Sequence, residues 1–373
     1  MIYLDTAATS LQKPPEVSRA VMSAMARCAS PGRGGHPPAT AAADLVFRCR
    51  EVLAEFFHVP SPEQVVLTMN ATHGLNIAIR HLVGPGTRVA VSGYEHNAVM
   101  RPLHDVGARV EILRAPPFDT AGMLTAFASA LDRADVCVCT HVSNVFGNIL
   151  PVGEIAALCR ERGIPIILDA SQSAGVLPVD FSSLGAAYIA MPGHKGLLGP
   201  QGTGVLLCGG VPDWLMSGGT GMDSRSASMP DYLPERLEPG TQNVPGAAGL
   251  MAGVNFLRRK GLGKVAAHER SLIRLLAREV DGWAGGRAVF SCNGQEQAGV
   301  LSVLHPRLDC EEVAAALGRN GVCVRGGLHC APQAHITAGD VERGSVRFSV
   351  GPWTTAAEIR QTGEIYRKVV TKL

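Results

Sequence analysis

Aromatic residues, net charge, lysine and long apolar runs are all scarce in this sequence. Phe, Trp and Tyr make up 5% of its 373 residues, and 34 basic side chains nearly balance 32 acidic ones. A net charge of +2 lacks the strongly basic character of a nucleic-acid-binding protein. No apolar run approaches the roughly 18 residues of a membrane-spanning helix. We therefore expect neither a nucleic acid nor a membrane as a partner.

Signs of secretion are missing as well. The first residues, MIYLDTAATS, lack the basic region and the apolar stretch of a signal peptide. The ten cysteines form no C-x-x-C pair, which disfavours a zinc ribbon, and a disulfide scaffold is improbable in a long chain of this kind. We expect a cytoplasmic protein whose cysteines, such as Cys137 and Cys139, are mostly buried thiols.

Apolar residues are plentiful, at 46%, and between residues 14 and 240 they follow an alternating pattern. Short β-rich runs, several of them continuously apolar like strands covered on both faces, alternate with helical patterns. The predicted strands are 64–68, 88–92, 109–113, 135–140, 164–169, 186–191 and 204–208. This alternation predicts an α/β fold, with a large domain over 14–240 built on a mostly parallel, seven-stranded sheet.

The pattern changes in the last third of the chain. Residues 211–249 are rich in Gly, Pro and Ser, which predicts a long loop, and a helical stretch follows over roughly 250–282. The weaker predicted strands are 300–305, 321–325 and 345–350. A helix at 310–320 separates two of them, which predicts a smaller α+β domain. We assign residues 1–13 and 241–373 to it.

Three predicted strands of the large domain are each followed by a chemically useful side chain. Thr72 stands at the start of a helix, where free N–H groups bind phosphate, although an isolated threonine there is more often an ordinary cap. Asp169 ends a buried strand, where ligands of parallel sheets bind, but it could equally cap a helix. Lys195 lies in a glycine-rich loop and offers the amine of a Schiff base, whereas most lysines are merely solvated.

The three segments together are more specific than any one of them. Between Lys13 and Lys260 the sequence contains a single lysine, Lys195. A phosphate anchor, a strand-end carboxylate and an amine are what pyridoxal 5'-phosphate requires, because the carboxylate keeps the pyridine nitrogen protonated and the ring can then accept electrons. The residues therefore predict an enzyme that uses this cofactor.

The motifs also resemble a known family over almost the whole chain. The segments that carry the resemblance are YLDTAAT, EHNAV, SNVFGN, LDASQSAG, GHKGLLGPQGTG, PGTQN, RGGLHCA and the final VRFS strand. Their joint occurrence resembles the class V aminotransferase fold, in particular cysteine desulfurases and the similar selenocysteine lyases. The resemblance implies the fold type I of transferases that depend on pyridoxal phosphate.

Roles for individual residues follow from this resemblance. It implies that Lys195 holds the cofactor as a Schiff base, that Asp169 pairs with the pyridine nitrogen and that Gln172 contacts the ring hydroxyl. His96 would stack on the ring and relay protons. The residues implied at the phosphate are Ala71, Thr72, His194 and, from the neighbouring subunit, Thr241. That last residue implies a homodimer with shared sites.

The resemblance also implies a substrate and a reaction. Arg347 would clamp the substrate carboxylate, which suits its bidentate geometry, and Asn144 would contact both the substrate and the cofactor. His36 either lines the substrate entrance or is merely exposed. Lys195 would remove the α-proton of L-cysteine, and Cys330, as a thiolate helped by His329 or Arg325, would take the sulfur as a persulfide and release L-alanine. An acceptor protein would then receive the sulfur for iron–sulfur clusters or thiolated products.

The sequence also departs from the family pattern. Pro192 stands where many relatives have a phosphate-binding serine, Leu328 where close relatives often have a second histidine, and Asn70 replaces a glycine. None of these departures removes an essential reactive group. Selenocysteine lyase, or another C–S lyase of this fold, is the main alternative function, followed by an aminotransferase and a non-catalytic scaffold. The cluster of His329, Cys330 and His335 fits no standard zinc motif, so we expect no metal.

Overall fold

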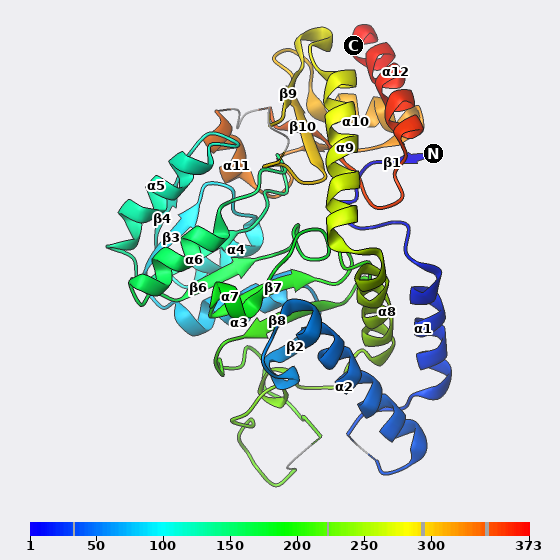
Figure 1. Cartoon of the computed structure of the whole chain (residues 1–373). Coiled ribbons are helices and arrows are strands. Elements are labelled where there is room, and N and C mark those ends of the chain that lie inside the picture. The colour runs from blue at the N-terminus through cyan, green and yellow to red at the C-terminus, as the bar shows by residue number, and fades with distance from the viewer. Residues whose placement is uncertain (33, 222–223, 292–294, 340–342) are drawn as a thin grey trace.

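The large sheet of the computed structural model, which describes residues 1–32, 34–221, 224–291, 295–339 and 343–373, has seven strands. Their order is β2-β8-β7-β6-β5-β3-β4; neighbours from β7 to β4 are parallel, and β8 is antiparallel to both β2 and β7 (Figure 1). The strands are β2 Val65–Thr68, β3 Arg88–Ser92, β4 Arg109–Leu113, β5 Val136–Thr140, β6 Ile166–Asp169, β7 Tyr188–Pro192 and β8 Gly204–Cys208. The predicted α/β class and the mostly parallel sheet are confirmed.

Helices cover both faces of this sheet. The helices between and around the strands are α1 Pro15–Arg27, α2 Pro37–Phe57, α3 Ala71–Leu82, α4 Asn97–Asp105, α5 Thr120–Leu131, α6 Val152–Glu161 and α7 Phe181–Leu184. Apolar residues of α2, α5 and α6 form one core with one face of the sheet, and those of α3 and α4 form a second core with the other face. Every residue of β5 to β8 is buried, as expected for strands covered on both sides.

A second, smaller layer of strands and helices lies above the large sheet in Figure 1. It contains a four-stranded antiparallel sheet, β12-β13-β10-β9, and a parallel pair, β1-β11. Its elements are β1 Ile2–Tyr3, α9 Leu262–Val280, β9 Arg287–Val289, β10 Val300–Leu304, α10 Cys310–Arg319, β11 Val322–Cys323, β12 Arg325–Gly327, α11 Pro332–Ala338, β13 Ser345–Ser349 and α12 Ala356–Lys372. Most of their apolar residues form a separate core, while a few, such as Val265 of α9 and Ala334 of α11, pack in the core of the large sheet. The predicted small α+β unit is present.

The predicted loop and helix over 211–282 are partly wrong. The loop ends earlier than predicted, because the side chain of Asn243 accepts the N–H of Gly246 and caps helix α8, Val244–Lys260. The helical stretch is two helices, since Gly261 between α8 and α9 has a φ of 84°, a conformation that favours glycine. The short strands β1 and β9 were not predicted.

The division into domains stays a prediction. Two observations support assigning residues 1–13 to the small domain: β1 pairs with β11, and Asp5 bridges to Ser349. However, apolar residues of α8 such as Leu250 belong to the core of the large sheet. We therefore propose that the boundary lies at Gly261 rather than at 240.

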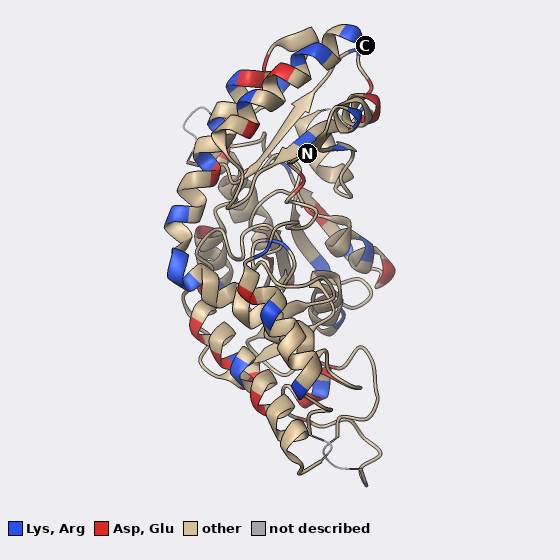
Figure 2. Cartoon of the chain, turned by 90° about the vertical axis from the view of Figure 1, so that its right-hand side faces the viewer, with Lys and Arg blue, Asp and Glu red and all other residues tan. Residues whose placement is uncertain are grey.

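Charged residues of both signs alternate along the helices of one side of the molecule (Figure 2), in line with the small net charge. Among the described residues, no helix has the length and apolar character that crossing a membrane requires.

Candidate active site

Polar side chains gather where parallel strands of the large sheet end. Asp169 is the last residue of β6, and His96, Asn144 and Lys195 come shortly after β3, β5 and β7. Carboxyl ends of parallel strands meet at one edge of a sheet, where ligands of such folds bind. The charges that act on the His96 ring include those of Asp169 and Lys195. The structure therefore brings together His96, Asp169 and Lys195, three of the residues that the sequence predicted for the cofactor ring.

Lys195 occupies a tightly packed turn after β7. A Cβ atom on Gly193 would lie 2.1 Å from Thr203 Oγ1, and one on Gly196 would lie 2.3 Å from the carbonyl oxygen of Ala174, so glycine is required at both positions. Burial lowers the pKa of Lys195 to about 8, and the nearby carboxylate of Asp169 opposes this shift. A substantial fraction of the amine is therefore neutral near physiological pH, as a nucleophile or proton carrier must be.

Asp169 and His96 are both fixed by backbone N–H groups. Asp169 is 3% exposed, and its Oδ1 accepts the N–H of Ser171 at 2.9 Å. His96 caps helix α4, because its Nδ1 accepts the N–H of Ala98 at 3.0 Å. Burial lowers the pKa of His96 to about 4, so the ring is neutral and carries its proton on Nε2. A neutral, immobilised imidazole suits stacking on an aromatic ring.

The start of helix α3 has the geometry of an anion site. Asn70 caps the helix, accepting the N–H of His73 at 2.9 Å, while the first-turn N–H groups of Ala71 and Thr72 lack acceptors inside the helix. Asn70 has a φ of −173°, an extended conformation open to any residue, which explains why the glycine of the family pattern is not needed. The loop lies against β8, since a Cβ on Gly204 would lie 2.6 Å from the Asn70 carbonyl carbon.

Arg347, on β13, brings a positive charge to the candidate site from the small domain. Its side chain is 1% exposed; Nη1 donates to the carbonyl oxygen of Asn144 at 3.1 Å and Nη2 to Asp5 Oδ1 at 2.7 Å. Among the described residues its buried Nε has no hydrogen-bond partner. Burial lowers the pKa of Arg347, yet the guanidinium stays charged, and the N–H of Nε is among the donors left for a ligand. This arrangement fits the predicted clamp on a carboxylate.

Cys330 lies in an exposed turn between β12 and α11. Residues His329 and Cys330 have φ values of 53° and 58°, a left-handed turn held by two hydrogen bonds. The N–H of Asn97 donates to the Cys330 carbonyl at 2.7 Å, and Asn144 Nδ2 donates to the His329 carbonyl at 2.8 Å. Both anchors sit next to the strand-end residues, so the thiol is tied to the same site.

Of the two predicted helpers of Cys330, the structure favours Arg325. Its Nη2 lies 3.6 Å from the Cys330 sulfur, where a guanidinium stabilises negative charge on sulfur. The His329 Nε2 is instead 3.0 Å from Ser345 Oγ. Burial lowers the pKa of His329 well below its usual value, so this ring is neutral and contributes no positive charge.

Four predicted site residues make contacts that do not test their assigned roles. His36 is exposed and caps α2 through a 3.4 Å contact from the Ala39 N–H to its Nδ1, and it does not lie with the strand-end residues. The Nε2 of Gln172 donates to the Ala7 carbonyl at 3.0 Å. The Nδ1 of His194 lies 3.0 Å from Thr9 Oγ1. Thr241 is exposed and lines a cavity with Met69 and His73. Their assigned roles stay predictions.

Two residues that support the site were missed by the sequence reasoning. Asp5, which holds Arg347, lies in the YLDTAAT segment that only the resemblance singled out. Glu95 is buried, and its Oε1 accepts the N–H of Thr140 at 2.7 Å and the hydroxyl of Ser92 at 2.5 Å. It thus joins the ends of β3 and β5 beside His96. Its one local signal is an acidic residue three positions after an apolar strand.

Comparison with known proteins places this site in a family. The family model described as Aminotransferase class-V matches residues 2–362. The chain belongs to this family. It is 31% identical to a probable cysteine desulfurase of Methanothermobacter thermautotrophicus, over 99% of this chain and 94% of that protein. It is 30% identical to a probable cysteine desulfurase of Pyrococcus abyssi, over 89% of this chain and 85% of that protein.

A solved structure supports the same placement. The apo structure of a cysteine desulfurase from Thermococcus onnurineus NA1 superposes with a TM-score of 0.91 at 28% sequence identity, covering 100% of this chain and 95% of that one. Proteins of this family depend on pyridoxal phosphate. The described residues fit that cofactor: a buried amine at Lys195, a buried carboxylate at Asp169, a neutral ring at His96 and free N–H groups at the start of α3.

Proposed function

We propose that this class V aminotransferase-family protein is a cysteine desulfurase, which takes L-cysteine, retains its sulfur on Cys330 as a persulfide and releases L-alanine. The observation that carries the proposal is the attachment of the Cys330 turn to Asn97 and Asn144. These hydrogen bonds hold an exposed thiol, next to the guanidinium of Arg325, at the edge of the sheet that carries Lys195 and the other strand-end residues.

Each residue of the site has a distinct task in this reaction. Bound pyridoxal phosphate supplies an electron sink for negative charge at the α-carbon of the substrate. Arg347 and Asn144 orient the substrate carboxylate, and the neutral fraction of the Lys195 amine takes the α-proton. The Cys330 thiolate attacks the substrate sulfur: the carbon–sulfur bond breaks, a sulfur–sulfur bond forms, and the carbon gains a proton. The reaction balances, because the thiols of L-cysteine and Cys330 are consumed while L-alanine and a persulfide on Cys330 are formed.

The same proposal extends to the assembly. The exposed position of Thr241 in a cavity beside the start of α3 supports a homodimer in which this residue reaches the phosphate of the partner's cofactor. The exposed turn of Cys330 supports transfer of the sulfur to an acceptor protein. We further propose that the protein acts in the cytoplasm.

The proposed function is tested by locating the sulfur. The cofactor-loaded protein is treated with L-cysteine, alanine is quantified, and the thiols are alkylated and mapped by mass spectrometry. We expect stoichiometric alanine and one added sulfur on the peptide that contains Cys330. Added sulfur on Cys323, or alanine without any enzyme-bound sulfur, would overturn the persulfide mechanism and indicate a simple C–S lyase.

A further inference from the structure

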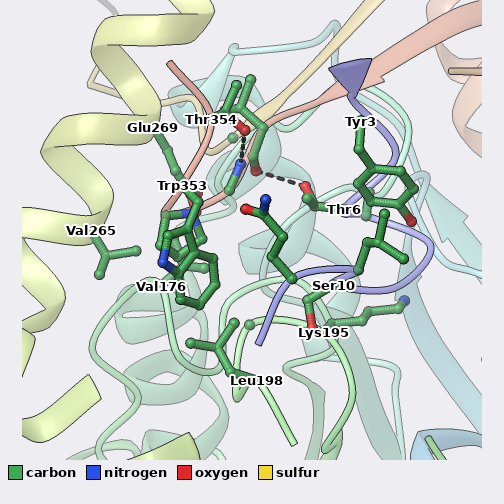
Figure 3. A pocket seen from close by; sticks show the side chains of 18 of the residues that line it. Tyr3, Thr6, Ser10, Val176, Lys195, Leu198, Val265, Glu269, Trp353 and Thr354 are labelled. Carbon is green, nitrogen blue, oxygen red and sulfur yellow. Dashed lines mark hydrogen bonds between the residues drawn. The ribbon is translucent and has the colours of Figure 1, made fainter. Parts of the chain in front are cut away.

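A cavity of ≈ 130 Å³ extends from Lys195 toward the small domain (Figure 3). Its walls come from residues 1–12, from α9 and from residues 350–354, and it meets the candidate active site at Lys195 and Gln172. His96, Asp169 and Cys330 are not among its lining residues. The cavity is therefore a separate lobe, to which the proposed reaction assigns no role.

Glu269, on α9, brings a carboxylate into this lobe. Glu269 is 4% exposed, and among the described residues no hydrogen-bond donor reaches its carboxylate oxygens. The absence of a side chain at Gly299 gives the carboxylate room, since a Cβ there would lie 2.5 Å from Glu269 Oε2. Burial raises the pKa of Glu269 to about 8. A buried carboxyl group without a partner is costly to ionise, so a ligand that supplies a positive charge would be favoured.

The hydrogen bond and ring contact of Lys260, a positive charge that acts on Glu269, are made with other residues. Lys260, at the end of α8, acts electrostatically on Glu269, but its Nζ donates to the Pro352 carbonyl at 3.3 Å. The same Nζ lies 5.8 Å from the centre of the Trp353 ring, within the range of a cation–π contact. Lys260 therefore leaves the hydrogen-bonding capacity of the carboxylate for a ligand.

The rest of the lobe is mainly apolar. Its walls include Val176, Leu198 and Val265, and Trp353 lies against them (Figure 3). The indole is held in place by stacking on Phe256, with ring centres 5.7 Å apart and planes inclined by 22°. An apolar cavity of about 150 Å³ holds a benzene molecule, so this lobe has room for a ligand body of roughly that size.

We propose that this lobe binds a small organic cation, an alkylguanidinium or alkylammonium with about four carbons. Its charged end pairs with the carboxylate of Glu269, and its alkyl chain packs against Trp353 and Val265. A guanidinium suits the carboxylate best, because two parallel N–H groups can donate to its two oxygens. The second carboxylate of the lining, Glu358, is already engaged, because its Oε2 accepts the N–H and the hydroxyl of Thr355. Glu269 is therefore the group that would pair with the cation. The proposal does not depend on the function proposed above.

Binding of a cation to Glu269 has a pH signature. Because burial raises the pKa of the free carboxyl group to about 8, a cation that binds below this pH must displace a proton, and its affinity rises with pH up to about 8 and then levels off. The lining also contains other titratable groups, namely Lys195, Glu358, Tyr3 and the α-amino group of Met1. Two more come from the helices beside it: Lys260 from α8, and His268, which precedes Glu269 on α9. A substitution that removes only the Glu269 carboxylate separates its titration from that of the other groups.

The test is calorimetric titration of the cofactor-loaded protein with n-butylguanidinium. This probe stays cationic over the pH range and has no free amine to react with the cofactor, and n-butylurea serves as its neutral isostere. We expect binding of n-butylguanidinium that is at least about tenfold tighter than that of n-butylurea, and stronger at pH 8.5 than at pH 6. The pH comparison needs no variant and therefore does not depend on the folding of one.

Variants assign the binding to the lobe. Glu269→Gln keeps the shape of the side chain and removes a charge that burial penalises; we expect it to weaken n-butylguanidinium at least about tenfold and to abolish the pH dependence. Glu161→Gln, at an exposed carboxylate of α6, should change neither the affinity for n-butylguanidinium nor its pH dependence. No binding to the unaltered protein at millimolar probe, equal affinity for n-butylurea, or unchanged affinity in Glu269→Gln would each overturn the proposal.

Discussion

Arg347 Nη2 lies 2.7 Å from Asp5 Oδ1, although 342 residues separate the two in the sequence. Asp5 follows β1, which pairs with β11 of the small domain, and Arg347 lies on β13. The ion pair therefore ties the N-terminal segment to the strand that carries the proposed substrate clamp. Because Arg347 is 1% exposed, Asp5 also supplies the negative charge that makes a buried guanidinium tolerable.

Asp5→Asn is expected to weaken substrate binding more than turnover. An amide cannot balance the guanidinium charge, so Arg347 loses its fixed orientation, and hydrogen bonds to charged groups are worth about 1.5–3 kcal/mol. We expect KM for L-cysteine to rise at least about tenfold with a smaller change in kcat, measured by alanine release. Asp44→Asn, at an exposed position of α2, should leave both constants unchanged. A normal KM in Asp5→Asn would show that Asp5 does not position the clamp.

Lys195→Ala is expected to remove the visible absorption of bound cofactor together with turnover. The side chain supplies the amine at the edge of the large sheet, and burial raises its neutral fraction by lowering its pKa to about 8. Absorption spectra after addition of pyridoxal phosphate and gel filtration measure the attachment. Lys264→Ala, at an exposed position of α9, is the matched control. A Lys195→Ala protein with an unchanged visible band would refute the assignment of this lysine.

Residues that follow apolar strands could be predicted from the sequence, and residues held by distant partners could not. The continuous apolar runs of β5, β6 and β7 fix where the parallel strands end, so Asp169 and Lys195 were expected at one edge. Asp5 escaped prediction because its partner is far away in the chain and nothing local distinguishes it from a turn aspartate.

The same contrast explains the errors in secondary structure. The beginning of α8 contains a proline, which is tolerated in a first turn because its missing N–H would be unpaired there. It also contains glycines, whose low helix propensity is outweighed by the cap from Asn243 and by packing of apolar residues in the large core. The cavity around Glu269 was also not foreseen, since it is assembled from the N-terminal segment, α9 and residues 350–354.

Cys330→Ala is expected to lower alanine release from L-cysteine at least about a hundredfold, which corresponds to about 2.7 kcal/mol of barrier. The thiolate of L-cysteine is a poor leaving group, so a thiol held 3.6 Å from Arg325 should matter greatly as the acceptor. Cofactor absorbance should persist, because Cys330 does not hold the ring. The measurement is single-turnover alanine formation, alongside Cys323→Ala as the matched control.

Selenocysteine separates the two chemistries that the family resemblance left open. A selenolate leaves with little help, so release of alanine from L-selenocysteine should fall much less in Cys330→Ala. Equal and small losses with both substrates would mean that Cys330 is no sulfur acceptor. A much higher rate with L-selenocysteine than with L-cysteine in the unaltered protein would favour a selenocysteine lyase.

The pH dependence of stability offers a last prediction, carried by Glu269. Burial raises its pKa from 4.5 to about 8 in the folded protein, so between these values the folded state binds more protons than the unfolded one. The contribution of Glu269 to stability therefore falls as pH rises from about 4.5 to about 8, and stays constant above that. The Glu269→Gln protein does not lose this stability. Its free energy of unfolding, relative to that of the unaltered protein, should therefore increase through this window, to the order of a few kcal/mol at pH 9.

Thermal unfolding of both proteins at pH 5 and at pH 9 measures this gain. Burial also raises the pKa of Glu95 to about 8 and lowers that of His96 to about 4. Both groups are present in both proteins, so their contributions to the pH dependence cancel in the difference. Glu161→Gln, at an exposed site, should show no pH-dependent gain. A Glu269→Gln gain that is the same at both pH values would mean that this carboxyl group is already paired in solution, which would also remove the basis for a cation site beside it.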